Sequence, residues 1–147
     1  MADHVTEKTM IAASPEEIMD VLRDFPRYPE WARDLKAVEV MDTDEEGRGR
    51  DVRFRAAAMG RSTSYTLRYE HTDADRLSWK LIAGDLTRKL DGHYEMVSRA
   101  DGHTDVSYQL EVDLIVPLPG FIKRRTQVKI THTALRELKA RVEAPGT

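Results

Sequence analysis

The chain has 147 residues, which is typical of one compact domain, so we expect residues 1–147 to fold as a single unit. Hydrophobic residues make up 40% and charged residues 33% of the sequence, and no apolar run approaches the roughly 20 residues of a membrane-spanning helix. The absence of cysteine excludes disulfide bonds and thiolate chemistry. The net charge of −3 argues against nucleic-acid binding, because nucleic-acid-binding proteins usually carry a basic excess.

The N-terminal residues contain no recognisable signal for export. Met1-Ala2-Asp3-His4 lacks the basic region and the apolar stretch of a secretory signal, so we expect a cytoplasmic protein. The next segment, Val5 to Ala13, mixes β-branched and apolar residues with charged ones. This composition is typical of a strand.

A helix is predicted directly after this strand. Ser14-Pro15-Glu16-Glu17 places a hydroxyl at the N-cap, proline at the first helical position and a carboxylate three residues after the cap, which is a capping box. One apolar stripe runs from Ile18 to Phe25 and ends before Pro26. The two prolines that precede Trp31 allow only a turn or a brief helical piece in that segment.

From Leu35 onward, apolar and polar residues alternate with a period of two, which indicates β-strands with one buried face. Short polar turns containing aspartate or glycine separate the alternating runs. The predicted strands cover residues 35–42, 52–58, 63–70, 77–84, 86–96 and 106–116. Because consecutive strands joined by short turns pair with each other, we expect an antiparallel meander.

The last element is predicted to be a long helix. Pro117-Leu118-Pro119-Gly120 breaks the preceding strand, and the sequence from there to Glu143 has no further proline or glycine and is rich in helix formers. At roughly 100° per residue, one broad sector of this helix is apolar, with Thr131 near its centre. We expect this sector to cover one face of the sheet, which gives an α+β fold. The apolar residues of the sector are Val128, Ala134, Leu135, Leu138 and Val142.

The element order and several local phrases resemble the START-like, or helix-grip (SRPBCC), superfamily, which includes polyketide cyclase/dehydrase and lipid-transport domains. The likeness is greatest to small bacterial, especially actinobacterial, proteins, and none of its phrases is a catalytic signature. It implies a curved seven-stranded antiparallel sheet wrapped around a long C-terminal helix, with an apolar cavity in which relatives hold lipids, sterols, quinones, polyketides or plant hormones. The phrases are Ala13-Ser14-Pro15-Glu16-Glu17-Ile18, Tyr28-Pro29-Glu30-Trp31, Leu90-Asp91-Gly92-His93-Tyr94 and Pro117-Leu118-Pro119-Gly120-Phe121.

Such a cavity would be lined by the inward faces of the strands and of the last helix. Tyrosine is frequent on these faces, and each buried hydroxyl needs a partner that a dry core of leucine and valine would not supply. This mixture favours a ligand pocket, although the alternative that the rings simply fill a core stays open. The predicted lining residues are Trp31 near the rim, Phe54, Tyr65, Tyr69, Trp79, Arg88, Tyr94, Tyr108, Val128, Thr131 and Leu135, and Gln127, near the inner sector of the helix like Thr131, is a weaker candidate.

Two charged features have alternative readings. Arg88 shares its parity with Leu86 and Leu90, so it either contacts a polar atom of the ligand or pairs with a carboxylate at the cavity mouth. Lys123, Arg124 and Arg125 lie in the first turns of the last helix, where the helix dipole disfavours positive charge. They either touch an anionic membrane transiently or form an ordinary solvated face.

The functional hypothesis is the binding, and in one form the transport, of a hydrophobic small molecule such as a lipid, a quinone or a polyketide. Its rival is a polyketide aromatase/cyclase-dehydratase, for which the inward faces offer no identified catalytic acid or base. A third, weaker hypothesis is an adaptor for a respiratory or ribosomal complex. The five histidines have no metal-ligand spacing, and neither a phosphate loop nor a nucleophile motif is present, so we expect no metal and no cofactor.

Overall fold

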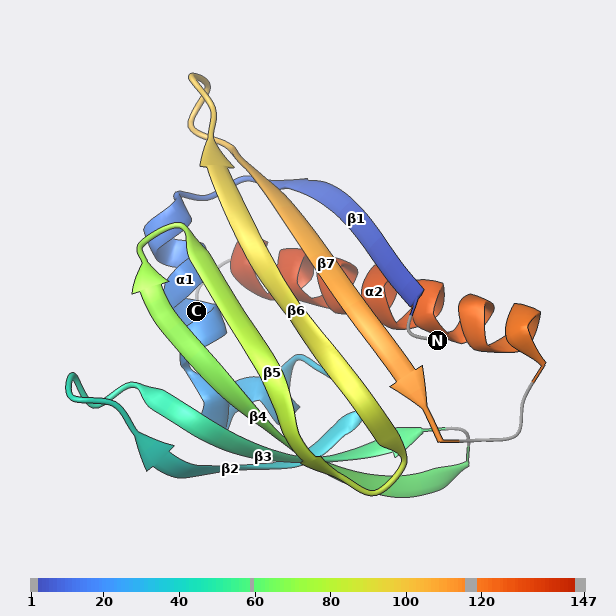
Figure 1. Ribbon diagram of the computed structural model, residues 1–147. Helices are drawn as coiled ribbons and strands as arrows, with labels where there is room; N and C mark the ends of the chain where they lie inside the picture. The colour runs from blue at the N-terminus through green and yellow to red at the C-terminus, as the bar shows by residue number, and fades with distance from the viewer. Residues whose placement is uncertain (1–2, 59, 116–118, 145–147) are drawn as a thin grey trace.

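The computed structural model describes residues 3–58, 60–115 and 119–144. Seven antiparallel strands form one curved sheet, and a long helix packs against its concave side (Figure 1). This confirms the predicted α+β helix-grip architecture. The strands are β1 (Asp3–Ile11), β2 (Leu35–Thr43), β3 (Gly49–Ala58), β4 (Arg61–Asp73), β5 (Arg76–Gly84), β6 (Thr87–Ser98) and β7 (Thr104–Leu114), in the sheet order β1-β7-β6-β5-β4-β3-β2.

The sheet order follows from short turns and one long connection. Strands β2 to β7 pair with their neighbours in sequence, whereas β1 pairs with β7 and therefore forms the edge opposite β2. The chain crosses between the two edges through the helix α1 (Pro15–Arg23) and the 3₁₀ helix η1 (Phe25–Glu30). These two helices cover one end of the concave face.

The predicted capping box starts α1. The Ser14 hydroxyl accepts from the backbone N–H of Glu17, while the Glu17 carboxylate accepts from the backbone N–H of Ser14. The preceding strand ends at Ile11, two residues earlier than predicted, because the Ala13 N–H donates to the Ile11 carbonyl in a turn. The brief helical piece predicted before Trp31 is η1.

The long helix α2 (Gly120–Glu143) packs mainly against β1 and β7. Its buried stripe contains Thr131, Leu135 and Leu138, as predicted, together with Gln127. Val128 was predicted to belong to this stripe and does not, since 47% of its surface is exposed. The reason is that α2 lies over the edge of the sheet: His132, one turn further along the flank that carries Val128, contacts Glu7 of the edge strand β1 at 2.9 Å.

The predicted strand extended to Val116, which lies outside the described residues, as do Pro117 and Leu118 of the following turn. No helix in the described ranges is long and apolar enough to cross a membrane.

Gly92 of β6 is required by a close approach between strands. It lies directly opposite Trp79 of β5, and a Cβ atom there would be 2.4 Å from the carbonyl oxygen of Gln109 and 2.9 Å from the indole ring of Trp79. The carbonyl belongs to the backbone of β7 and cannot turn away. Glycine therefore allows β6 to sit between its two neighbours.

We expect Gly92→Ala to lower the free energy of unfolding by about 1–3 kcal/mol, the usual cost of overpacking. Urea denaturation followed by far-UV circular dichroism measures this. Gly120→Ala is the matched control, because a Cβ at Gly120 meets nothing within 4 Å. Equal stability of the two variants would contradict the steric argument.

Candidate ligand-binding interior

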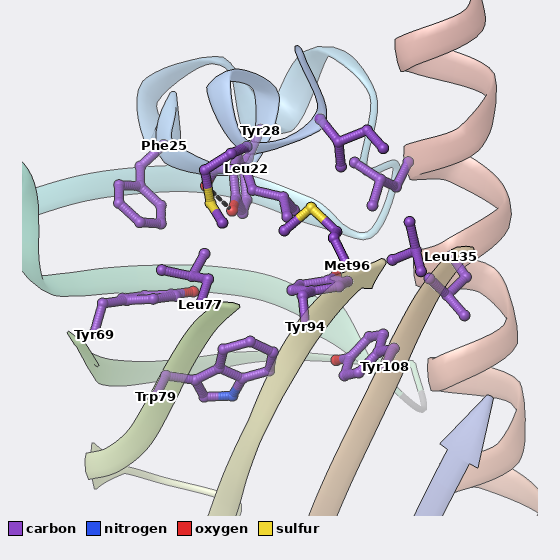
Figure 2. Close-up of a cluster of buried hydrophobic side chains, with 14 of the residues drawn as sticks. Leu22, Phe25, Tyr28, Tyr69, Leu77, Trp79, Tyr94, Met96, Tyr108 and Leu135 are labelled. Atoms are coloured by element: carbon purple, nitrogen blue, oxygen red, sulfur yellow. Dashed lines mark hydrogen bonds between the residues drawn. The ribbon is translucent and has the colours of Figure 1, made fainter. Parts of the chain in front are cut away.

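An aromatic wall covers the concave face of the sheet. Register places Tyr94 opposite Tyr108 and Tyr69 opposite Trp79, with ring centroids 4.6 and 5.7 Å apart. Trp79 in turn lies 5.4 Å from Tyr94, so the rings form a continuous surface across β4 to β7 (Figure 2). The strand pair β3 and β4 extends this surface with a further stacked pair. Phe54 and Tyr65 are opposite each other, 5.4 Å apart.

The 3₁₀ helix η1 closes one end of the wall. Phe25 packs on Tyr69 with ring centroids 4.6 Å apart, and Tyr28 lies 6.0 Å from Phe54. The Tyr28 hydroxyl donates a hydrogen bond to the carbonyl oxygen of Leu22, which anchors η1 to α1 (Figure 2). Trp31 follows η1, half-buried and 5.0 Å from Tyr28, and its place at the rim of a cavity stays a prediction.

Burial decreases along the strands toward the opposite end of the interior. On β5, Leu77 is fully buried and Trp79 nearly so, whereas Leu81 is half-buried. On β7, Tyr108 is likewise buried and Leu114 is half-buried. The interior is therefore tightly closed at the α1 end and more accessible at the end where β7 finishes. The half-buried inward residues at this end are Tyr65, Leu81, Leu90 and Leu114.

No described residue forms a hydrogen bond with the hydroxyl groups of the tyrosines in the aromatic wall. Tyr69, Tyr94 and Tyr108 are buried, and burial raises the pKa of each phenol well above its ordinary value of 10. Tyr65 shows the same shift for the same reason. All four therefore stay protonated at neutral pH and offer uncharged O–H donors. None of these hydroxyl oxygens is among the fully buried side-chain atoms without a partner, so each remains accessible to water or to an oxygen atom of a ligand.

The helix contributes one further unpaired polar atom. Gln127 is buried and donates from its side-chain nitrogen to the carbonyl oxygen of Val112, 3.1 Å away, while its side-chain oxygen is buried without a partner in the described chain. Thr131, one turn further along, uses its hydroxyl within the helix by donating to the carbonyl oxygens of Gln127 and Val128. Gln127 was a weaker candidate from the sequence, because it lies one turn before Thr131 near the inner sector of the helix. The structure places it on the buried stripe.

Two residues that were predicted to line the interior, Arg88 and Val128, are exposed on the surface instead. Arg88 is exposed, because β6 has an irregularity between Thr87, which pairs with Leu114, and Lys89, which pairs with Asp113. Arg88 is an extra residue in β6 at this point, and it interrupts the alternation of inward and outward side chains. Arg88 therefore does not point inward as Leu90 does. Val128 is exposed on the flank of α2, as described above.

His71 was missed by the sequence reasoning, although its position two residues after Tyr69 was a signal. Its ring stacks on Tyr69 with centroids 6.4 Å apart and meets Phe25 edge-on at 6.3 Å. The Nε2–H group donates to the carbonyl oxygen of Gly49 at 2.7 Å, and Nδ1 is buried without a partner among the residues described. Burial lowers the pKa of His71 below its ordinary value of 6.5.

Two hollows of the molecular surface lie outside this interior. One, of about 330 Å³, borders the start of β2 and the turn after β3, where Lys36, Arg55 and Gly60 line it. The other, of about 360 Å³, lies over β4 to β7, where outward side chains such as Glu70, His93 and Glu111 line it. In the described part of the chain, no group of three His, Asp or Glu residues is arranged to hold a metal ion.

Comparison with known proteins agrees with this geometry. Residues 2–143 match the family model described as "Polyketide cyclase / dehydrase and lipid transport". The chain belongs to this polyketide cyclase/dehydrase and lipid transport family. No curated protein sequence matches it.

Solved structures of similar fold span almost the whole chain. A START superfamily protein from Mycobacterium smegmatis has a TM-score of 0.89 and 23% identity, covering 95% of this chain and 97% of that one. The ZhuI aromatase/cyclase from Streptomyces sp. R1128 has a TM-score of 0.76 and 16% identity, covering 99% of both chains. A STAR-related lipid transfer protein from Xanthomonas axonopodis has a TM-score of 0.73 and 19% identity, covering 95% of this chain and 85% of that one. At these identities the likeness shows the fold.

The lowered pKa of His71 predicts a pH dependence of stability. Arg23 and Arg48 lower this pKa further, while the hydrogen bond to Gly49 and the charge of Asp44 oppose the shift. Because the folded state binds the proton less readily than the unfolded state, stability is present above the unfolded pKa and falls on acidification. We expect wild type to lose more unfolding free energy than His71→Gln between about pH 8 and about pH 5.

Urea denaturation at each pH measures this difference, with about pH 8 as the reference at which the imidazole is neutral in both states. His93 also has a pKa lowered by burial, but it is present in both proteins and cancels in the comparison. Parallel pH profiles for wild type and His71→Gln would contradict the prediction.

Proposed function

We propose that the protein binds an uncharged hydrophobic small molecule with polar oxygen atoms against the aromatic wall, between the sheet and α2. One observation supports this above the others: the hydroxyls of Tyr65, Tyr69, Tyr94 and Tyr108 find no partner among the described residues. A sheet face built only for packing would carry aliphatic side chains or hydroxyls paired within the protein. Ligand carbonyl or hydroxyl oxygens are suitable acceptors for these groups.

The charge distribution favours a neutral ligand. The buried polar side chains of the described chain are Thr63, Thr104, Gln127 and Thr131, and none of them is charged. A carboxylate or phosphate in this interior would lose its hydration without meeting a cation. Lipid acyl chains, quinones and polyketides satisfy this condition, and their apolar area would contribute roughly 25 cal/mol per Å² on burial.

Entry is proposed at the end where β7 finishes. There the inward side chains are half-buried, including Leu81 and Leu114, whereas η1 packs tightly on the wall at the other end. The predicted lining residues Phe54, Trp79, Thr131 and Leu135 would supply the contact surface, with Trp31 near the rim. Gln127 would accept a hydrogen bond from a ligand hydroxyl through its unpaired oxygen.

A polyketide aromatase/cyclase is the second candidate, and His71 is the observation that favours it. Its imidazole contacts the wall at Tyr69, and Nδ1 has a free lone pair in the described structure. Aldol closure and dehydration need such a base together with a donor for the carbonyl oxygen. We rank this function second because Phe25 packs on both Tyr69 and His71, which places the imidazole at the closed end of the wall.

Mass spectrometry of organic extracts from the natively purified protein tests the ligand class directly. We expect a recurrent neutral molecule with a long apolar part and at least one carbonyl or hydroxyl oxygen. The aromatase/cyclase alternative instead predicts a cyclised aromatic product after incubation with a poly-β-ketone substrate, and loss of that product in His71→Gln.

Two matched probes test the role of the hydroxyls. 1,4-Naphthoquinone carries two carbonyl acceptors and naphthalene carries none, so Tyr94→Phe/Tyr108→Phe should weaken quinone binding about tenfold and leave naphthalene binding unchanged. Quenching of tryptophan fluorescence measures quinone binding, since Trp79 contacts both tyrosines, and competition measures naphthalene binding.

Tyr28→Phe is the matched control, because the Tyr28 hydroxyl is already engaged with Leu22 and should not reach a ligand. If the double variant binds both probes as wild type does, the hydroxyls have no part in recognition. If wild type binds neither probe and yields no extractable ligand, the proposed function is wrong.

A further inference from the structure

Residues 114–136, which include the first half of α2, differ from the rest of the chain in their charge. Residues 114–136 contain five of the 23 Lys and Arg residues and none of the 26 Asp and Glu residues. The remainder of the chain is therefore strongly acidic, while this segment is basic. Such a separation of charge on a chain with a net charge of −3 creates a local positive field.

Four of these cations, Arg136 among them, have no ion-pair partner in the described part of the chain, and three of the four lie in the first half of α2. Arg124, Arg125 and Lys129 are exposed, and no described carboxylate lies within ion-pair distance of them. Lys123 behaves differently, because its ammonium group donates to the carbonyl oxygen of Leu114 at 3.3 Å and is half-buried. Of the three residues expected from the sequence to meet a membrane, Arg124 and Arg125 are thus available, and Lys129 joins them.

Apolar side chains are exposed on the same part of the helix. Phe121 has 68% of its surface exposed, and Val128, two turns further along the same flank, has 47%. Arg124 and Arg125 lie between them at spacings of three and four residues, so the two kinds of side chain share one helix face. An exposed phenylalanine flanked by unpaired arginines is typical of helices that lie at a lipid interface.

We propose that this docking face, which consists of Phe121, Arg124, Arg125, Val128 and Lys129, binds the surface of an anionic lipid bilayer. The cations would contact headgroup phosphates, and the apolar side chains would enter the boundary with the acyl chains. A bilayer fits better than an acidic protein, since the apolar side chains project from a convex helix and no described pocket surrounds them to receive a partner. The interior ligand is not needed for this contact.

Vesicle flotation tests the docking face. Wild type should float with phosphatidylcholine vesicles containing about 25 mol% phosphatidylglycerol, not with pure phosphatidylcholine vesicles, and binding should weaken as salt is raised. Arg124→Gln/Arg125→Gln/Lys129→Gln should bind at least tenfold more weakly. The matched control is Arg50→Gln/Arg53→Gln/Lys80→Gln, which removes three exposed cations from the sheet and should bind as wild type does.

A fluorescent label tests the apolar part. Because the chain has no cysteine, Phe121→Cys can carry a single environment-sensitive dye, and Val97→Cys, 60% exposed on β6, serves as the control. Anionic vesicles should shift the emission of the dye at residue 121 to shorter wavelength and leave that at residue 97 unchanged.

Equal vesicle binding by the two triple variants would overturn the proposal. So would binding to soluble polyglutamate as strong as binding to vesicles, with no emission shift at residue 121, because that result would identify an acidic protein as the partner. Naphthoquinone binding without vesicles is measured separately, so failure of the docking face and failure of the proposed ligand function are distinguishable.

Discussion

The register between neighbouring strands determines what the concave face of this protein offers. Side chains alternate between the two faces of a strand, so a slip of one residue would move a whole row of rings into solvent. The pairings of Tyr94 with Tyr108 and of Tyr69 with Trp79 therefore have to hold together. Gly92 is part of the same constraint, since only a residue without a side chain leaves room for Trp79 opposite it.

The same register explains why close ring contacts do not by themselves indicate a filled core. Directly opposed residues on one face of a sheet lie about 5 Å apart whether or not anything covers them. The contact of Trp79 with Tyr69 joins directly opposed residues, and that with Tyr94 is a diagonal contact between neighbouring strands, so both are lateral. The contact of Phe25 with Tyr69 instead joins separate layers. The layered contacts occur at the η1 end, where they include Tyr69, whereas the rings of Tyr65, Tyr94 and Tyr108 have only lateral ring contacts. Whether the wall lines a pocket or belongs to a solid core is therefore better judged from the hydrogen bonding of its tyrosine hydroxyls than from the distances between its rings.

Local patterns in the sequence predict much of this arrangement, and the failures come from tertiary geometry. The capping box at Ser14 and the alternation through Tyr108 depend on neighbours in the chain, so both could be predicted. Arg88 was misplaced because a one-residue irregularity between strands leaves no mark in the alternation itself. Val128 was misplaced because helical periodicity gives the width of an apolar sector, but not where the helix lies relative to the sheet edge. The ligand contacts predicted for the wall remain predictions.

The position of α2 over β1 and β7 also gives the helix two independent faces. Its buried stripe, with Gln127 and Thr131, meets the sheet and contains no charge, while Arg124, Arg125 and Lys129 project into solvent. Positive charge on the buried stripe would have to be desolvated without a nearby carboxylate, so the cations are confined to the outer faces. An anionic surface that attracts these cations therefore approaches α2 from outside, near the end where burial of the wall decreases. A neutral ligand and a charged surface can thus be recognised by one helix without competing for the same side chains.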